Sequence, residues 1–144
     1  MSPTASLNPK IVGQAENAHE AVLARALATT DLTKQHWIAL TLAATAGEPL
    51  GAGALAGRLT SALRSAEPAA AHRILGDLAA GGMLTAEHSV TPAGQELFAR
   101  VRAETGQVIA RAYAGIPAGD LQTAARVLEL VTDRLDREAA RTGA

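Results

Sequence analysis

The sequence contains no cysteine. This absence excludes disulfides, thiolate metal ligands and cysteine nucleophiles, and it fits a reducing compartment such as the cytoplasm. Aromatic residues make up only 2 % of the 144 residues. Alanine and leucine carry most of the apolar content instead. Because both residues favour helices over strands, we expect a mainly α fold rather than a large sheet.

Neither sign of charge is in clear excess. The chain has 13 basic and 14 acidic residues and a formal net charge of −1, so contact with nucleic acid would depend on where its basic side chains lie. Long apolar runs are also missing, since no window approaches the ~18 uninterrupted apolar residues of a membrane span. The N-terminus lacks the charged start and apolar run of a signal peptide. We therefore expect a cytoplasmic protein with no membrane partner.

The sequence does contain helical periodicity. From Pro9, apolar residues recur every three or four positions, as Ile11, Ala15, Ala18 and Val22, with Leu23 and Leu27 on an adjacent row. Caps, prolines and glycines predict helices over about 9–30, 34–47, 52–63 and 68–81, a long helix from Pro92, and a last helix to about 140. The last helix places Leu121, Ala124, Leu128, Val131 and Leu135 on one face. Residues 1–8 are predicted to be disordered.

The glycine-rich stretch PLGAGALAGRL, residues 49–59, fits the G-x-G-x-x-G/A pattern of a dinucleotide-binding loop. That loop needs a strand before it and an acidic residue about 20 positions later. Here the preceding segment has the pattern of a helix and ends in Pro49. We therefore predict a turn between two helices and no cofactor. Gly57 is expected to let one helix pack closely on another.

The helices at 52–63 and 68–81, with a turn at 64–67 between them, predict a helix-turn-helix whose second helix would enter a DNA major groove. The short, partly alternating segment 84–91 predicts a hairpin wing. On the second helix, spacing places four apolar residues on the buried side: Ala71, Ile74, Leu75 and Leu78. The opposite side would carry Ala69, Ala70, His72, Arg73, Gly76 and Asp77.

In order and spacing, four segments resemble the MarR family of winged helix-turn-helix transcription regulators: LTKQHWIAL (32–40), LGAGALAGRL (50–59), AHRILGDLAAGGML (71–84) and VTPAGQELFARV (90–101). The resemblance implies one domain over 9–144, with a winged lobe at about 33–91 and helical dimerisation regions at about 9–30 and 92–140. It also implies a homodimer that binds palindromic double-stranded DNA. Such a repressor would release its operator when a small aromatic ligand binds. The wing departs from the family, because TAEHS alone separates Leu84 from Val90 and contains no arginine or lysine.

Candidate DNA-binding residues lie on both helices and in the turn: Arg73, His72, Ala69, Arg64, Ser65, Arg58 and Thr60. Arg73 could bond a guanine edge or a phosphate; alternatively it is a solvated residue paired with Asp77. From Glu48 to Thr91 the lobe has three basic and four acidic residues, so its net charge is 3 − 4 = −1. This balance keeps open an alternative, a MarR-fold dimer with weakened DNA binding that acts as a small-molecule-binding or protein-interaction module.

Five residues are candidates for a ligand cavity: Trp37, His36, Leu23, Leu27 and Phe98. Trp37 is also expected as a core residue, which is the commoner role of a single tryptophan. The four histidines are scattered in the sequence, so no metal site is predicted. No nucleophile or phosphate-loop motif is present, and we expect no enzyme activity. The alternating charges of Asp133, Arg134, Asp136, Arg137 and Glu138 indicate a solvated helix face.

Overall fold

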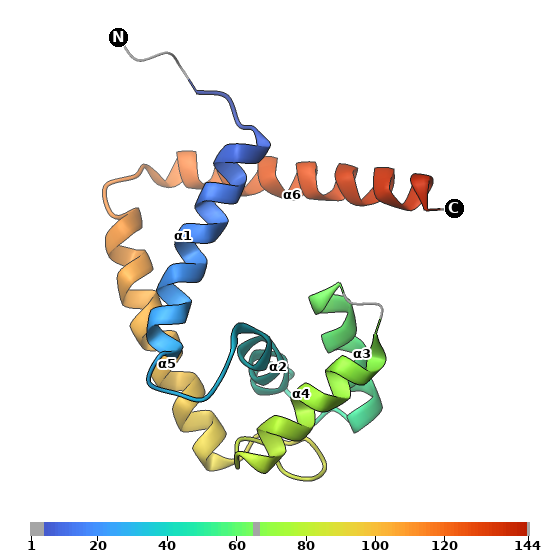
Figure 1. The fold of residues 1–144 in the computed structure, drawn as a ribbon. Coiled ribbons are helices and arrows are strands. Elements are labelled where there is room, and N and C mark those ends of the chain that lie inside the picture. The colour runs from blue at the N-terminus through green and yellow to red at the C-terminus, as the bar shows by residue number, and fades with distance from the viewer. Residues whose placement is uncertain (1–4, 65–66, 144) are drawn as a thin grey trace. The chain divides into compact units, whose positions relative to one another are not determined.

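The computed structural model describes residues 5–64 and 67–143. In this part of the chain six helices follow one another: α1 (Pro9–Leu27), α2 (Lys34–Ala44), α3 (Ala52–Leu63), α4 (Pro68–Ala80), α5 (Pro92–Tyr113) and α6 (Ala118–Thr142) (Figure 1). The mainly α fold predicted from composition is confirmed. The chain divides into two compact units, Met1–Val108 and Ile109–Ala144.

Local sequence sets where these helices begin. The Asn8 side chain accepts a hydrogen bond from the Ile11 amide at 3.0 Å and caps α1, with a proline at the first turn. Thr33 caps α2 in the same way, and its own amide is bonded by the His36 side chain, which completes a capping box. Pro68 starts α4, where the missing amide hydrogen costs nothing because no helical acceptor faces it.

The core of the first unit lies where α2, α3 and α4 contact one another. Figure 1 shows these three helices gathered below α1. The apolar side predicted for α4 is buried, together with apolar residues of α2, α3, the wing and the first turns of α5: Ala39, Leu40, Leu55, Leu59, Ala71, Ile74, Leu75, Leu78, Leu84 and Phe98. Because α4 is held along one whole side, its other side is fixed in orientation.

Two glycines differ in what surrounds them. Gly57 is exposed, and a Cβ added there would meet nothing within 4 Å, so the expected close helix packing at Gly57 is wrong. Close packing occurs instead at Gly94, in the first turn of α5. A Cβ at Gly94 would lie 2.3 Å from the Met83 carbonyl oxygen and 2.9 Å from Val90 Cγ1. Glycine therefore lets α5 start directly against the base of the wing.

The wing between α4 and α5 is short. Leu84 and Val90 form one isolated antiparallel bridge. Beyond it, the Thr85 amide donates to the Ser89 carbonyl at 2.8 Å and the Ser89 amide donates to the Thr85 hydroxyl at 3.1 Å. The truncated wing predicted from TAEHS is confirmed: the segment closes after a single bridge because it has no residues for a longer ladder.

Apolar residues of the long helices are only partly covered. Ala26, Leu27 and Val101 form a second buried cluster between α1 and α5. Nearer its start, α1 exposes Ala15 and Ala18 from the predicted stripe. Among the described residues of α6 none is buried, and four large apolar side chains are exposed by 37–63 %: Leu128, Leu130, Val131 and Leu135. Both units therefore leave apolar helix surface uncovered.

Candidate nucleic-acid interface and ligand cavity

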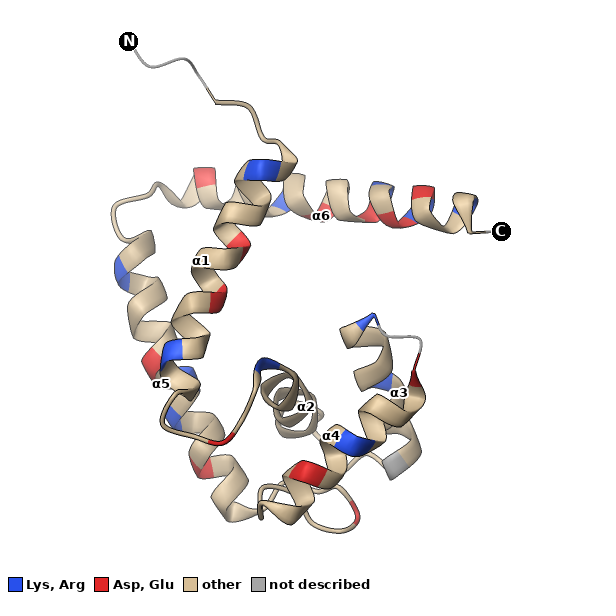
Figure 2. Ribbon diagram, viewed as in Figure 1, with Lys and Arg blue, Asp and Glu red and all other residues tan. Residues whose placement is uncertain are grey.

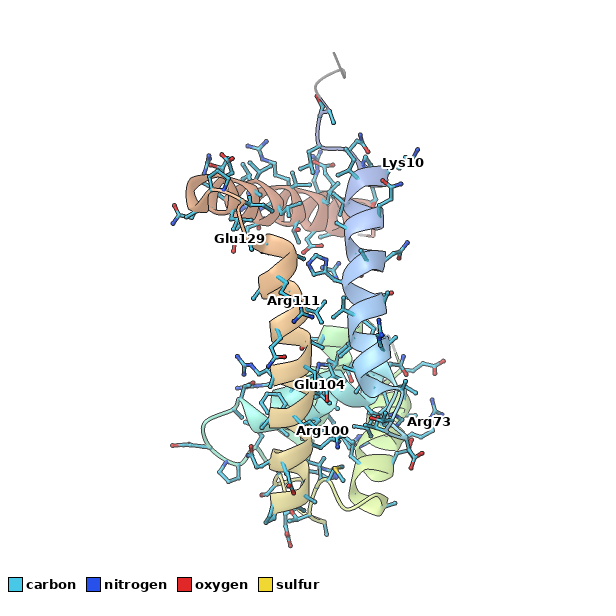
Figure 3. The ribbon with its side chains drawn as sticks, turned by 90° about the vertical axis from the view of Figure 1, so that its left-hand side faces the viewer. Lys10, Arg73, Arg100, Glu104, Arg111 and Glu129 are labelled. Carbon is cyan, nitrogen blue, oxygen red and sulfur yellow. The ribbon has the colours of Figure 1, made fainter. Side chains whose placement is uncertain are left out.

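The polar side of α4 is open to solvent. Ala69, His72, Arg73, Gly76 and Asp77 are all exposed, opposite the buried apolar side. Figure 3 shows the Arg73 side chain at the outer surface of the lobe. Within the described part of the chain, Arg73 forms no ion pair, so the alternative pairing with Asp77 is not the one observed. Its guanidinium is therefore available to an external acceptor.

Other basic positions lie on α3 and at its end. Arg58 is exposed on α3, and Thr60 is half-buried with its hydroxyl donating to the Ala56 carbonyl at 2.9 Å. Arg64 is the residue that ends α3, with a left-handed backbone at φ 53°. Ser65 lies outside the described residues. Figure 2 shows basic positions on both α3 and α4, the two helices of the predicted helix-turn-helix.

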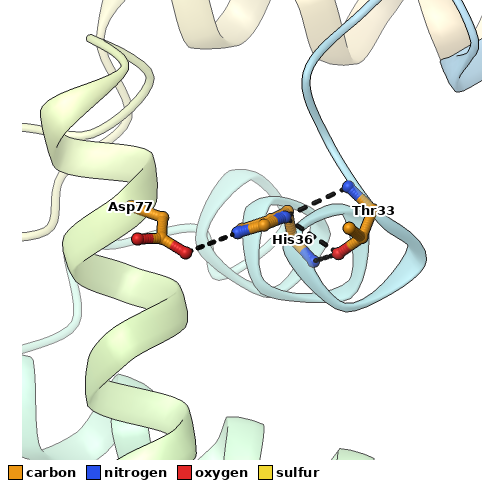
Figure 4. A network of polar contacts seen from close by, with 3 residues as sticks. All are labelled: Thr33, His36 and Asp77. Atoms are coloured by element: carbon orange, nitrogen blue, oxygen red, sulfur yellow. Dashed lines mark hydrogen bonds and ion pairs between the residues drawn. The ribbon is translucent and has the colours of Figure 1, made fainter.

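Asp77 is bonded to a residue of another helix. Its Oδ2 lies 3.0 Å from His36 Nε2, across 41 residues of sequence (Figure 4). On the other edge of the ring, His36 Nδ1 accepts from the Thr33 amide at 3.1 Å. An acceptor at Nδ1 places the ring proton of neutral His36 on Nε2, which then donates to Asp77. The contact ties the first turn of α2 to the last turns of α4.

A cavity of about 450 Å³ opens beside this contact. Its lining includes residues of the α1–α2 loop, α2, α4, the start of the wing and α5: Thr29, Thr30, Asp31, Leu32, His36, Asp77, Leu78, Gly81, Met83, Leu97 and Arg100. Apolar walls thus meet two carboxylates, an imidazole and a guanidinium. Such a mixture suits a small ligand with an apolar body and a few polar groups.

The five predicted ligand residues do not share one cavity. Trp37 and Phe98 stack in the core, with ring centroids 5.3 Å apart and planes inclined by 23°. Of the five, only His36 lines the 450 Å³ cavity. Leu23 and Leu27 line a separate cavity of about 340 Å³ between α1 and the start of α2. The expected packing role of Trp37 is the one that this arrangement supports.

Lys34 borders the smaller cavity and forms an ion pair with Glu20 of α1. The hydrogen bond from Lys34 to Glu20 raises the pKa of the lysine above its ordinary value, and burial opposes this slightly. Glu16 lies 4.0 Å from the same ammonium. Because the lysine is exposed and stays charged, this pair is a surface link between α1 and α2 and contributes little to stability.

Sequence reasoning missed Arg100 and Asp31 as cavity residues. A signal for Arg100 was present, because it follows Leu97 by three positions and therefore lies on the same side of α5. Arg102, also not predicted, places its guanidinium carbon 5.6 Å from the centre of the Phe98 ring. It adds a cation–π contact at the edge of the aromatic stack.

The charged residues of α6 form a solvated face. Arg137 bonds Asp133 at 2.8 Å and Arg141 bonds Glu138 at 3.1 Å, and Figure 2 shows basic and acidic positions alternating along this helix.

Among the residues that the structure describes, no group of three or more histidine, aspartate or glutamate side chains is placed to hold a metal ion. In the same residues, no helix has the length and apolarity needed to cross a membrane.

No protein-family model matches this sequence, and no curated protein sequence matches it. Solved structures do match its fold. A MarR-family transcriptional regulator from Rhodococcus sp. RHA1 has a TM-score of 0.70 and 17 % identity, over 91 % of this chain and 98 % of that one. The chain has the MarR fold. The MarR-family protein Rv2887 of Mycobacterium tuberculosis matches in its complex with DNA, at a TM-score of 0.67 and 19 % identity over 88 % of this chain and 98 % of that one. The same protein matches in its complex with salicylic acid, at a TM-score of 0.63 and 20 % identity over 88 % and 99 %.

The MarR fold covers the helix-turn-helix of α3 and α4, the short wing and the long flanking helices. Two features belong to the side chains of this sequence and not to the backbone arrangement of the fold. The first is the wing sequence TAEHS, in which Glu87 is the only fully charged residue. The second is the hydrogen bond between His36 and Asp77, which joins α2 to α4 through two polar side chains.

Proposed function

We propose that this protein is a cytoplasmic, homodimeric transcription regulator, not an enzyme, that binds palindromic double-stranded DNA through α4. A small aromatic ligand would release the DNA, so that the protein acts as a ligand-responsive repressor. One observation carries the proposal. The α4 helix is buried along its apolar side and presents His72 and Arg73, with no ion pair at Arg73 among the described residues, on its exposed side.

The chemistry of this side suits the edges of DNA bases. Arginine can donate two hydrogen bonds to a guanine, and alanine can contact the methyl group of a thymine. Arg58 and Arg64, on α3 and at its end, would bind phosphates and fix the orientation of α4. The MarR-fold protein Rv2887 is known in a complex with DNA, which supports the same kind of partner here.

Uncovered apolar surface supports the homodimer. In α6, Leu128, Val131 and Leu135 recur at three- and four-residue spacing and are exposed by 40 %, 37 % and 63 %. A helix with such a stripe is stable in water when the stripe is buried against another surface. A second copy of the chain would supply that surface, and the resulting two-fold symmetry would match a palindromic operator.

The 450 Å³ cavity supports a ligand. Leu32, Met83 and Leu97 would contact an aromatic ring, and Arg100 would bind a carboxylate. The complex of Rv2887 with salicylic acid makes an aromatic acid a suitable first probe. In this assignment the ligand residues are His36 and Arg100, whereas Trp37 and Phe98 support the cavity from the core.

One observation favours a second function. The wing exposes Glu87 and has no basic residue, and acidic residues outnumber basic ones by one across the lobe from Glu48 to Thr91. A protein that contacts 6–10 phosphates normally brings several basic side chains to them. The alternative is therefore a MarR-fold dimer that has lost most of its DNA affinity and binds a small molecule or another protein.

Selection of bound sequences from random duplex DNA, followed by fluorescence anisotropy in rising salt, separates the two functions. A regulator selects a palindromic sequence, and contacts with 6–10 phosphates make its affinity fall by about 10³–10⁵ between 50 and 200 mM salt. Weak binding to every duplex, with no sequence selected, would contradict the regulator and favour the alternative. A mutated duplex of the same length is the control.

A further inference from the structure

Asp77 follows Arg73 by four residues on the exposed side of α4. Residues at this spacing are neighbours on a helix surface, and opposite charges there attract one another. Nevertheless, Asp77 bonds His36, and Arg73 has no ion pair within the described residues. The only acidic residue of α4 is thus held by a different helix, while its only basic residue stays available.

His36 is built to hold this carboxylate. Its side chain is only 15 % exposed, whereas that of Asp77 is 58 % exposed, so the histidine is the fixed partner and the aspartate is the one with room to turn. The capping box with Thr33 fixes the ring plane and leaves Nε2 as the donor (Figure 4). A donor fixed in direction favours one rotamer of Asp77 over the others.

We propose that His36 holds the Asp77 carboxylate away from Arg73 and so keeps Arg73 available to DNA. This inference rests on the proposed function and makes His36 a positioning residue, which does not touch DNA itself. When the hydrogen bond is lost, Asp77 turns to Arg73. The guanidinium of Arg73 then pairs with this carboxylate instead of with a guanine or a phosphate of the DNA.

The effect on DNA affinity follows from the contact that Arg73 would lose. A good bidentate contact between arginine and guanine contributes ~1–3 kcal/mol of discrimination. By the conversion of 1.4 kcal/mol for each factor of ten, the loss corresponds to a roughly fivefold to hundredfold weaker complex for each half-site. If a substitution at position 36 acted only by changing the surface charge, its effect on DNA affinity would be the same whether residue 77 is aspartate or asparagine.

A matched set of substitutions at position 36 tests the proposal. Glutamate and glutamine both suit the third residue of a capping box, so both His36→Glu and His36→Gln retain the cap. Glutamine can also donate to Asp77, but glutamate cannot. In the double variant His36→Glu/Asp77→Asn the asparagine donates to the glutamate, which restores the link at the net charge of the unchanged protein with neutral His36.

The experiment measures the dissociation constant of the intact protein for its selected duplex, by anisotropy, with folding checked by circular dichroism. His36→Glu is expected to bind at least about fivefold more weakly, and His36→Gln to bind normally. Asp77→Asn should strengthen binding at least about fivefold more in the His36→Glu background than in the unchanged protein. His36→Ala, alone and with Asp77→Asn, repeats the comparison without an added charge.

The outcomes are distinct. The proposal would be overturned if the changes at positions 36 and 77 altered the dissociation constant by independent factors in both the His36→Glu and the His36→Ala series. Such a result would mean that Asp77 does not compete for Arg73. Equal weakening by His36→Glu and His36→Gln would also overturn it. If the unchanged protein binds no duplex at low salt, the proposed function fails and takes this inference with it.

Discussion

Gly94 provides the sharpest test of how the wing is joined to α5. In Gly94→Ala the new methyl group would lie 2.3 Å from the Met83 carbonyl oxygen and 2.9 Å from Val90 Cγ1. Both distances are far inside van der Waals contact. The nearer atom belongs to the backbone, so a side-chain rotation cannot relieve the clash. The Met83 carbonyl also accepts a hydrogen bond from the Thr91 amide at 3.0 Å, which its displacement would weaken.

Three terms set the magnitude of the change in stability. Inserting a methyl group into a tightly packed site costs ~1–3 kcal/mol, and a weakened hydrogen bond adds up to ~1 kcal/mol. Alanine regains at most ~1 kcal/mol through its higher helix propensity. We expect Gly94→Ala to lower the free energy of unfolding by about 1–3 kcal/mol, the balance of these terms. For a chain near this length, each kcal/mol lowers the melting temperature by about 2–4 °C.

Gly106→Ala is the matched control, because it lies in the same helix and its Cβ would meet nothing within 4 Å. It should raise the free energy of unfolding by up to ~1 kcal/mol through helix propensity alone. Urea and thermal unfolding, followed by circular dichroism at one fixed protein concentration, measure both variants. Equal or greater stability of Gly94→Ala than of the unchanged protein would refute the close packing of α5 against the wing.

Three further predictions concern the proposed function. Arg73→Ala should weaken binding to the selected duplex by at least about tenfold, since ~1.4 kcal/mol or more of binding free energy is lost. Arg134→Ala on α6 is the control and should leave the affinity unchanged. Anisotropy measures both variants, and normal binding by Arg73→Ala would exclude α4 as the helix that reads the DNA. Leu135→Glu should dissociate the dimer by placing a charge in its apolar stripe, seen as a halved mass in analytical ultracentrifugation, whereas a persistent dimer would exclude this face as the interface. Salicylate should weaken DNA binding of the unchanged protein, because its carboxylate would bind Arg100 and would compete with Asp77 for His36. It should act far less on His36→Glu/Asp77→Asn, and equal release of both proteins would show that salicylate acts elsewhere.

Much of the fold could be predicted from short-range signals. Thr33, Pro68 and the pair Thr91-Pro92 mark helix starts through local hydrogen bonds or a fixed backbone angle, and these operate within four residues. The buried side of α4 was predictable because its apolar residues repeat with the helical period. The wing was predictable from its length, since the TAEHS segment leaves no room for a longer hairpin.

The candidate site was less predictable because its contacts join distant parts of the chain. His36 and Asp77 are 41 residues apart, and neither has a neighbour in sequence that points to the other. The sequence places Trp37 and Phe98 near a cavity, but their rings stack on each other, and that is a property of how α2 meets α5. Gly94 and Gly57 look alike in sequence. Only the position of the Met83 carbonyl explains why one is crowded and the other is open.

The closed turn of the wing makes it a natural insertion point for protein engineering. Its hydrogen bonds link Thr85 to Ser89, while Ala86 and Glu87 at the tip are exposed and contribute no side chain to the core. Exposed tips of this kind tolerate added residues. A longer loop carrying arginines could therefore be grafted between Ala86 and Glu87 without repacking the lobe, and the affinity gained would measure directly what a basic wing contributes.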